Sequence, residues 1–127
     1  MRNPRVTKKE NGLLKGAIRR VFSRSELRRK ILQLNSVEHM DINRKRVKKW
    51  SFCNECGVIH PSYTMAVDHI VPVIPVDSSF EEMSLDTVVD RLWCEENNLQ
   101  LLCELCHDIK TRAESSLRRE FKRGNKK

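Results

Sequence analysis

The chain has 127 residues, 39% hydrophobic and 6% aromatic, so it has room for one modest core. It has no apolar run of membrane-spanning length, and its basic N-terminus lacks the apolar stretch of a secretory signal, which predicts a cytoplasmic protein. The net charge of +8 divides into +12 for residues 1–50, −9 for 51–110 and +5 for 111–127. Basic flanks suit a polyanion better than a membrane, because no amphipathic anchor accompanies them; the alternative is that they only aid solubility.

Two helices are expected in the basic N-terminal part. The first should begin at Asn11, because apolar side chains recur at the spacing of one helix face: Leu14, Ala17, Ile18 and Val21. The second should be capped by Ser23 or Ser25 and shows similar spacing: Leu27, Ile31 and Leu34. We interpret these stripes as core packing. The opposite faces are basic and offer candidate phosphate contacts, among them Lys15 and Arg19.

The central part is expected to contain short strands. A basic run ends at Lys48 and Lys49, two further candidate nucleic-acid contacts, and leads into a first Cys-x-x-Cys pair. Residues 58–61 and 63–71 then predict two short antiparallel strands, of which the second delivers Asp68 and His69. A short helix is expected from Ser84 and a final helix from Cys103.

Two Cys-x-x-Cys pairs are the strongest motif of the chain. They supply four thiolates, the number that a tetrahedral structural zinc needs: Cys53, Cys56, Cys103 and Cys106. The 46 residues between the pairs exceed the ~15–20 of a compact zinc ribbon, but the free energy of loop closure rises only slowly with length. Disulfides do not suit a reducing compartment or the odd total of five cysteines. Buried or redox-active thiols are the alternative to zinc, and Cys94 reads as an ordinary buried cysteine.

An acid and two histidines accompany the cysteines. Successive strand residues point to opposite faces, so Asp68 and His69 should have different roles, one holding a metal while the other faces a substrate. His107 follows Cys106 directly, at the expected start of the last helix, and helix N-termini favour phosphate. These residue types carry out metal-assisted hydrolysis of phosphate esters.

The motifs taken together resemble a known family. The run from Asp68 to Pro72, followed by Asn98-Leu-Gln-Leu-Leu-Cys103-x-x-Cys106-His107-x-x-Lys110-Thr111, looks like the signature of zinc-bearing HNH endonucleases. It is especially similar to small phage-encoded HNH proteins. The resemblance covers about half of the chain, residues 50–112.

The resemblance implies an α+β fold: a small ββα-metal (His-Me finger) core with a structural zinc and added N-terminal helices. Residues 1–49 would form a basic helical extension, and 50–127 the HNH nuclease domain with a basic C-terminal helix or tail. The activity would be metal-dependent hydrolysis of DNA phosphodiester bonds, by nicking or double-strand cleavage, in phage DNA processing or packaging. DNA would be the partner, with phage packaging proteins as further partners, and the location would be the host cytoplasm.

The resemblance also assigns roles. His69 would be the general base, and Asn98 would orient it by bonding to its backbone; Asn97 is the rival for that place. Asp68 and His107 would hold the catalytic Mg²⁺ or Mn²⁺, although other divalent ions are possible. Lys110 and Arg112 are candidate DNA contacts, or else solvated helix charges.

Two features are unusual beside the family pattern. The 28 residues between His69 and Asn98 are longer than the usual connection, and no third protein ligand for the catalytic ion is evident. The main alternative function is a non-catalytic, zinc-stabilised module that binds nucleic acid; a thiol redox protein is a more distant one.

Overall fold

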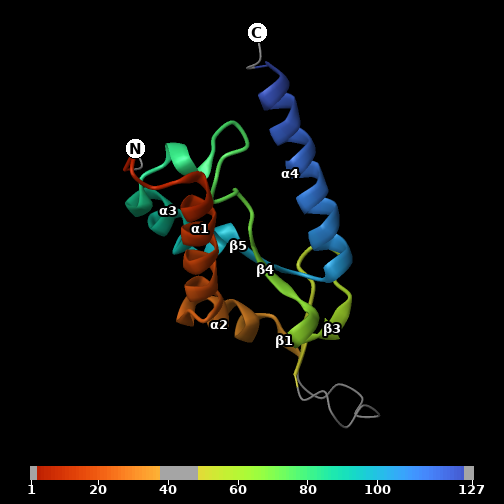
Figure 1. Cartoon of the computed structure of the whole chain (residues 1–127). Helices are drawn as coiled ribbons and strands as arrows, with labels where there is room; N and C mark the ends of the chain where they lie inside the picture. Colours follow the sequence, from red (N-terminus) through yellow and green to blue (C-terminus); the bar gives the residue numbers. More distant parts are fainter. Residues whose placement is uncertain (1–2, 38–48, 125–127) are drawn as a thin grey trace.

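The computed structural model describes residues 3–37 and 49–124 and has the expected α+β composition (Figure 1). The α-helices are α1 (Lys8–Ser23), α2 (Glu26–Leu34), α3 (Leu85–Leu92) and α4 (Glu104–Gly124). The strands are β1 (Ser36–Val37), β2 (Trp50–Phe52), β3 (Ile59–Pro61), β4 (Ala66–His69) and β5 (Leu99–Leu102). Short 3₁₀ turns cover Ser62–Thr64, Phe80–Glu82 and Glu96–Asn98.

The strands form two antiparallel sheets. One has the order β1-β2-β3, and the other pairs β4 with β5, so that Asp68 lies opposite Gln100 and His69 opposite Leu99. The sequence predicted that the segments now seen as β3 and β4 would be paired strands, and it did not predict β5. Both segments contain strands, but each pairs with another partner. Strand β5 is buried at Leu99, Leu101 and Leu102, so it lacks the alternation by which a strand is recognised.

Local signals explain where the helices begin. Helix α1 starts at Lys8, three residues before the predicted Asn11, because Thr7 and Glu10 form a reciprocal capping box. Ser25, one of the two predicted candidates, caps α2, and Ser84 caps α3 as predicted. These caps fix the helix starts from sequence-local bonds alone.

The buried face of α1 differs by one residue from the prediction. Phe22 is 6% exposed, whereas the predicted Val21 is 61% exposed. Leu14 and Ile18 pack against the core as expected, and Phe22 continues their i, i+4 row. This shift brings an aromatic ring from the N-terminal helices to the end of β4.

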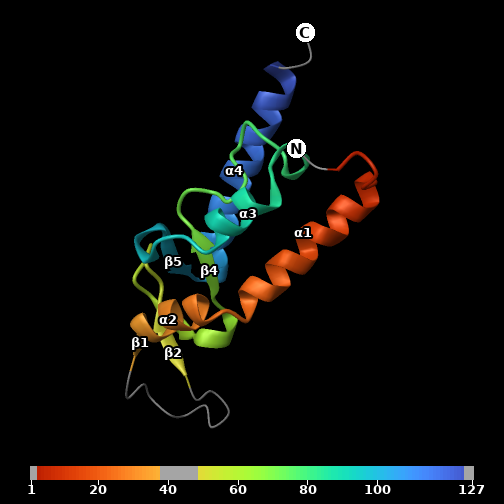
Figure 2. The same cartoon turned by 90° about the vertical axis from the view of Figure 1, so that its left-hand side faces the viewer.

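One hydrophobic core joins the two N-terminal helices to the strands and helices beyond Trp50. Phe22 and Ile31 belong to the same buried cluster as Leu101 and Leu102. The two views show α4 projecting beyond the strands, with its C-terminal end far from β1 and β2 (Figures 1 and 2). None of the helices within residues 3–37 and 49–124 combines the length and the apolar content that a membrane crossing requires.

Candidate metal centre and catalytic residues

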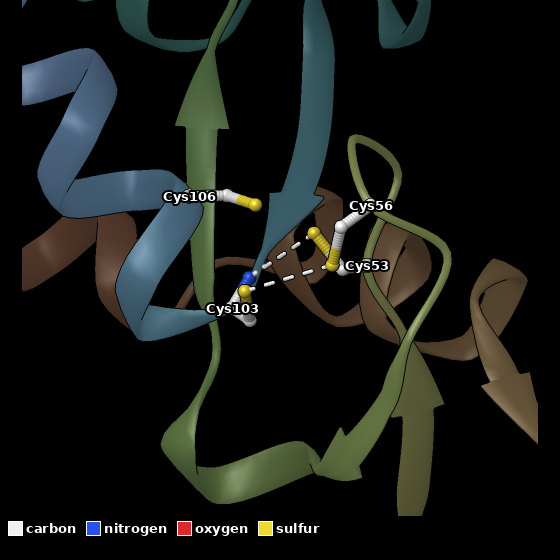
Figure 3. Close-up of side chains that lie close together, drawn as sticks. All are labelled: Cys53, Cys56, Cys103 and Cys106. Carbon is white, nitrogen blue, oxygen red and sulfur yellow. Dashed lines mark hydrogen bonds between the residues drawn. The ribbon is translucent and has the colours of Figure 1, made fainter.

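The four predicted zinc ligands converge on one point. Cys53 and Cys56 lie on the loop after β2, Cys103 lies between β5 and α4, and Cys106 is in the first turn of α4 (Figure 3). Their Sγ atoms all lie within 4.8 Å of one another. Zn–S bonds of about 2.3 Å in a tetrahedron place sulfurs about 3.8 Å apart, close to the 3.9 Å between Cys56 Sγ and Cys103 Sγ. The cluster could therefore hold a metal such as zinc.

Backbone geometry forms the first cysteine turn. Cys53 N donates to Val58 O at 3.0 Å, and Gly57 N donates to Cys53 O at 2.9 Å. Gly57 has φ +75°, a conformation that side chains with a Cβ rarely adopt. The turn thus aims Cys53 and Cys56 inward without strain.

The thiols of the cluster differ in acidity. Burial opposes ionisation of Cys53, but backbone N–H groups of Cys56, Cys103 and Glu55 outweigh it and lower the thiol pKa to about 6. For Cys106, hydrogen bonding to the Cys103 thiol, followed by burial, raises the pKa to about 12. Cys53 therefore ionises readily, whereas the neighbouring thiols make a second negative charge, on Cys106, unfavourable. A bound dication would relieve that repulsion, so the donor set fits a metal.

Asn54 ties the cysteine turn to β5, a role that the sequence did not reveal. Its Oδ1 accepts hydrogen bonds from Leu101 N at 2.6 Å and from Asn35 Nδ2 at 2.9 Å, and its own backbone N donates to Leu101 O at 2.8 Å. Asn54 lies between Cys53 and Cys56 in the sequence, and its polar amide beside two candidate metal ligands was the signal that could have indicated this role.

Asp68 is engaged by protein partners. Its Oδ2 accepts a hydrogen bond from Gln100 Nε2 at 3.0 Å and lies 3.1 Å from Lys110 Nζ. Lys110 also pairs with Glu114 and donates to His69 O at 3.0 Å. Burial lowers the pKa of Lys110, but hydrogen bonds to Glu114 and Asp68 outweigh it, so the pKa is raised. Lys110 therefore lies inside the site, at Asp68, rather than as a solvated helix charge.

His69 points to a different set of partners. Its Nε2 lies 2.8 Å from Leu92 O, at the end of α3, and its ring packs on Phe22 with centroids 5.1 Å apart. A carbonyl oxygen can only accept, so Nε2 carries a proton and Nδ1 of the neutral ring is an acceptor. The sequence could not reveal Leu92, because it contributes a backbone atom.

Asn98 holds the segment that follows His69. Its Oδ1 accepts from Val71 N at 2.9 Å, and its backbone O accepts from Ile70 N at 2.8 Å. The predicted side-chain bond to the His69 backbone is therefore replaced by one to Val71, two residues further on. The reason is register: His69 is the last residue of β4 and pairs with Leu99, so Asn98 faces the residues beyond the strand.

His107 is half-buried in the first turn of α4, where its backbone N donates to Cys103 O at 2.9 Å. Within residues 3–37 and 49–124, the four cysteines are the one group of three or more His, Cys, Asp or Glu residues whose ligand atoms gather as a metal would require. Among these described residues, Asp68 and His107 do not form such a group with a third ligand.

The predicted DNA contacts are dispersed. Arg112 pairs with Asp108 on the exposed side of α4, with 80% of its side chain exposed, and Arg19 and Lys49 are also exposed. Lys15 is half-buried; burial, followed by the positive charges of Arg19 and Arg118, lowers its pKa. Lys48 lies outside the described residues.

Comparison with known proteins adds no identification. No family model matches the chain, and no curated protein and no solved structure matches it.

Proposed function

We propose that this chain is a metal-dependent endonuclease of the HNH type that hydrolyses DNA phosphodiester bonds around a ββα-metal core. The order of elements supports the proposal. Strand β4 ends at His69, β5 pairs with it antiparallel, and α4 starts one residue beyond β5 with His107 in its first turn. The cysteine cluster would hold a structural zinc that anchors the start of α4 beside the sheet.

The single observation that carries the proposal is the hydrogen bond from His69 Nε2 to Leu92 O at 2.8 Å. It fixes the tautomer and leaves Nδ1 able to accept a proton, as a general base must. Phe22 supports one side of the ring and keeps it from turning. His69 Nδ1 would take the proton of the attacking water as the water's oxygen bonds to phosphorus and the bond from phosphorus to the leaving oxygen breaks.

Asp68 and His107 are the residues that would hold the catalytic ion. A carboxylate oxygen and an imidazole nitrogen suit Mg²⁺ or Mn²⁺, with water or phosphate oxygens completing the coordination. When bound, such an ion stabilises negative charge on the scissile phosphate and on the leaving oxygen. Lys110 pairs with both Asp68 and Glu114 in this structure. When an ion binds Asp68, the Lys110 ammonium would either keep Glu114 alone as its partner or face the phosphate.

The charge of the chain supports DNA as the substrate. The central part is acidic, so binding depends on the basic flanks, and the affinity should fall steeply with salt. Arg19, Lys49 and Arg112 are exposed and would meet a phosphate backbone, Arg112 by exchanging its pair with Asp108 for a phosphate.

The test is cleavage of supercoiled plasmid with Mg²⁺ or Mn²⁺. His69→Ala should lower the rate by roughly 10²- to 10⁴-fold, the usual contribution of a general base. His60→Ala is the matched control, because His60 lies on β3, in the other sheet. Undiminished cleavage by His69→Ala, with the fold verified by circular dichroism, would overturn the assignment.

One observation favours a second function, a non-catalytic zinc module that binds nucleic acid. The Asp68 carboxylate is already bonded to Gln100 and Lys110, an arrangement that needs no catalytic ion. That module would bind DNA in a salt-dependent way, and neither wild type nor His69→Ala would cleave it. Elemental analysis would separate both functions from a thiol redox protein, which would contain no zinc.

A further inference from the structure

We propose that Arg91 and Trp93 are positioning residues for His69, and that the long segment between β4 and β5 serves to supply them. The inference rests on the proposed role of His69. It concerns three consecutive residues at the end of α3, each of which reaches the surroundings of His69 by a different contact: Arg91, Leu92 and Trp93.

Arg91 clamps the backbone just beyond β4. Its Nε donates to Val73 O at 2.6 Å and its Nη2 donates to Pro72 O at 2.7 Å. Both bonds come from a cationic donor fixed in one plane, so they define the position of α3 relative to this backbone. Because Leu92 is the next residue, the clamp also fixes the carbonyl to which His69 Nε2 donates.

Trp93 supports the His69 imidazole indirectly, through its contact with Phe22. The Trp93 and Phe22 rings meet edge to face, with centroids 5.2 Å apart and an interplanar angle of 85°, and Phe22 in turn packs on His69. Trp93 remains 38% exposed. Because the Trp93 ring is partly exposed, burial contributes less to its free energy of folding than it would for a fully buried ring. Its edge-to-face contact with Phe22 is therefore the more important interaction.

The two contacts hold the same side chain in complementary ways. The carbonyl fixes which nitrogen carries the proton, and the Phe22 ring limits rotation of the imidazole. Asn98 holds Val71 between the two anchored points, so the segment from His69 to Val73 is bonded at each end. Such supporting contacts are what keep a general base within the narrow range of productive geometry.

The protein offers a matched control for Arg91. Arg118, on α4, likewise donates two guanidinium bonds to the same loop, to Ile74 O at 2.6 Å and Pro75 O at 3.1 Å. Unlike Arg91, it does not adjoin the residue whose carbonyl meets the His69 ring. If removing the guanidinium affects His69 only by loosening the loop, Arg118→Met and Arg91→Met should therefore have the same effect on His69.

The experiment reads His69 directly by ¹⁵N NMR of the histidine side chains in the zinc-loaded full chain, at one pH where the ring is neutral. We expect wild type and Arg118→Met to show His69 chiefly protonated on Nε2, and Arg91→Met to show a mixture of tautomers. Cleavage by Arg91→Met should fall roughly ten- to a hundredfold in kcat with little change in KM. Arg91→Lys should recover part of the loss, and Trp93→Phe should be milder than Trp93→Leu.

Unchanged His69 signals in folded Arg91→Met would overturn the proposal, as would an equal change in Arg118→Met. If Arg91→Met does not fold, Arg91→Lys and the two Trp93 variants decide the matter by the same signals. Absence of cleavage by wild type would count against the nuclease function alone, because the NMR signals report the position of His69 without turnover.

Discussion

The cysteine cluster includes Cys106, and the Asp68–His69 end of β4 contacts Lys110, one turn further along α4; the two regions are held in opposite ways. The four sulfurs face one another: Cys53 Sγ accepts a hydrogen bond from Cys103 N at 3.4 Å, and Cys56 Sγ lies 3.9 Å from Cys103 Sγ. Asp68 and His69 instead face apart, one toward Lys110 and Gln100, the other toward Leu92 and Phe22. The four thiols could hold a metal, whereas Asp68 and His69 each already have protein partners. Under the proposed function, the first region would stabilise the fold and the second would carry the chemistry.

The largest expected effect comes from breaking the first region. Cys103→Ser removes a ligand, and because metal binding is coupled to folding we expect a loss above about 4 kcal/mol and a fall in Tm above about 15 °C. Circular dichroism melts with and without chelator measure this. Cys94→Ser is the control, since Cys94 is a half-buried thiol outside the cluster. Equal melting of Cys103→Ser and wild type, both insensitive to chelator, would show that the cluster is not a structural metal site.

A smaller effect is expected where the second region is held by an amide. Asn98→Ala removes the acceptor of Val71 N, and because water reaches this exposed bond the loss should be about 0.5–1.5 kcal/mol. Asn97→Ala, an exposed neighbour, should cost less than about 0.5 kcal/mol. Urea unfolding of both variants compares them, and a reversed order would transfer the role to Asn97.

These two asparagines illustrate what the sequence could specify. The choice of Asn98 followed from its place in a motif, and the four cysteines followed from their spacing, because ligand chemistry admits few alternatives. The helix caps at Ser25 and Ser84 could also be predicted, since each serine side chain accepts a hydrogen bond from a backbone N–H only three residues further along.

Other features depend on tertiary contacts and had no pattern to reveal them. Strand β5 is buried at three of its four residues, so its apolar run reads equally well as part of a helix. Val21 and Phe22 both lie near the apolar face of α1, and only packing against His69 and Trp93 selects Phe22. Every residue has a backbone carbonyl, so the sequence could not indicate that the carbonyl of Leu92 would contact His69.

Lys110 offers a way to make the second region resemble the first. Lys110→Met removes the ammonium from Asp68 and Glu114 while keeping a flexible apolar stem. Two carboxylates then lack their counter-ion, so we expect Mn²⁺ to bind roughly three- to tenfold more tightly, about 1 kcal/mol, as measured by calorimetry on the zinc-loaded protein. Lys30→Met, which breaks the exposed pair with Glu96, should leave Mn²⁺ affinity unchanged. Weaker Mn²⁺ binding by Lys110→Met would mean that Lys110 orients Asp68 for the ion instead of competing with it.

The smallest effect is expected at Arg112, two residues beyond Lys110 on the same helix. Its side chain is 80% exposed and pairs with Asp108 at 3.1 Å, so Arg112→Gln should change the free energy of unfolding by less than about 0.5 kcal/mol. If Arg112 meets a phosphate, the same substitution should lower the slope of log affinity for DNA against log salt concentration by about 1. Fluorescence anisotropy on a labelled duplex at several salt concentrations measures the slope. An unchanged slope would leave Arg112 as a solvated helix charge and move the DNA-binding surface toward the basic flank that contains Arg19 and Lys49.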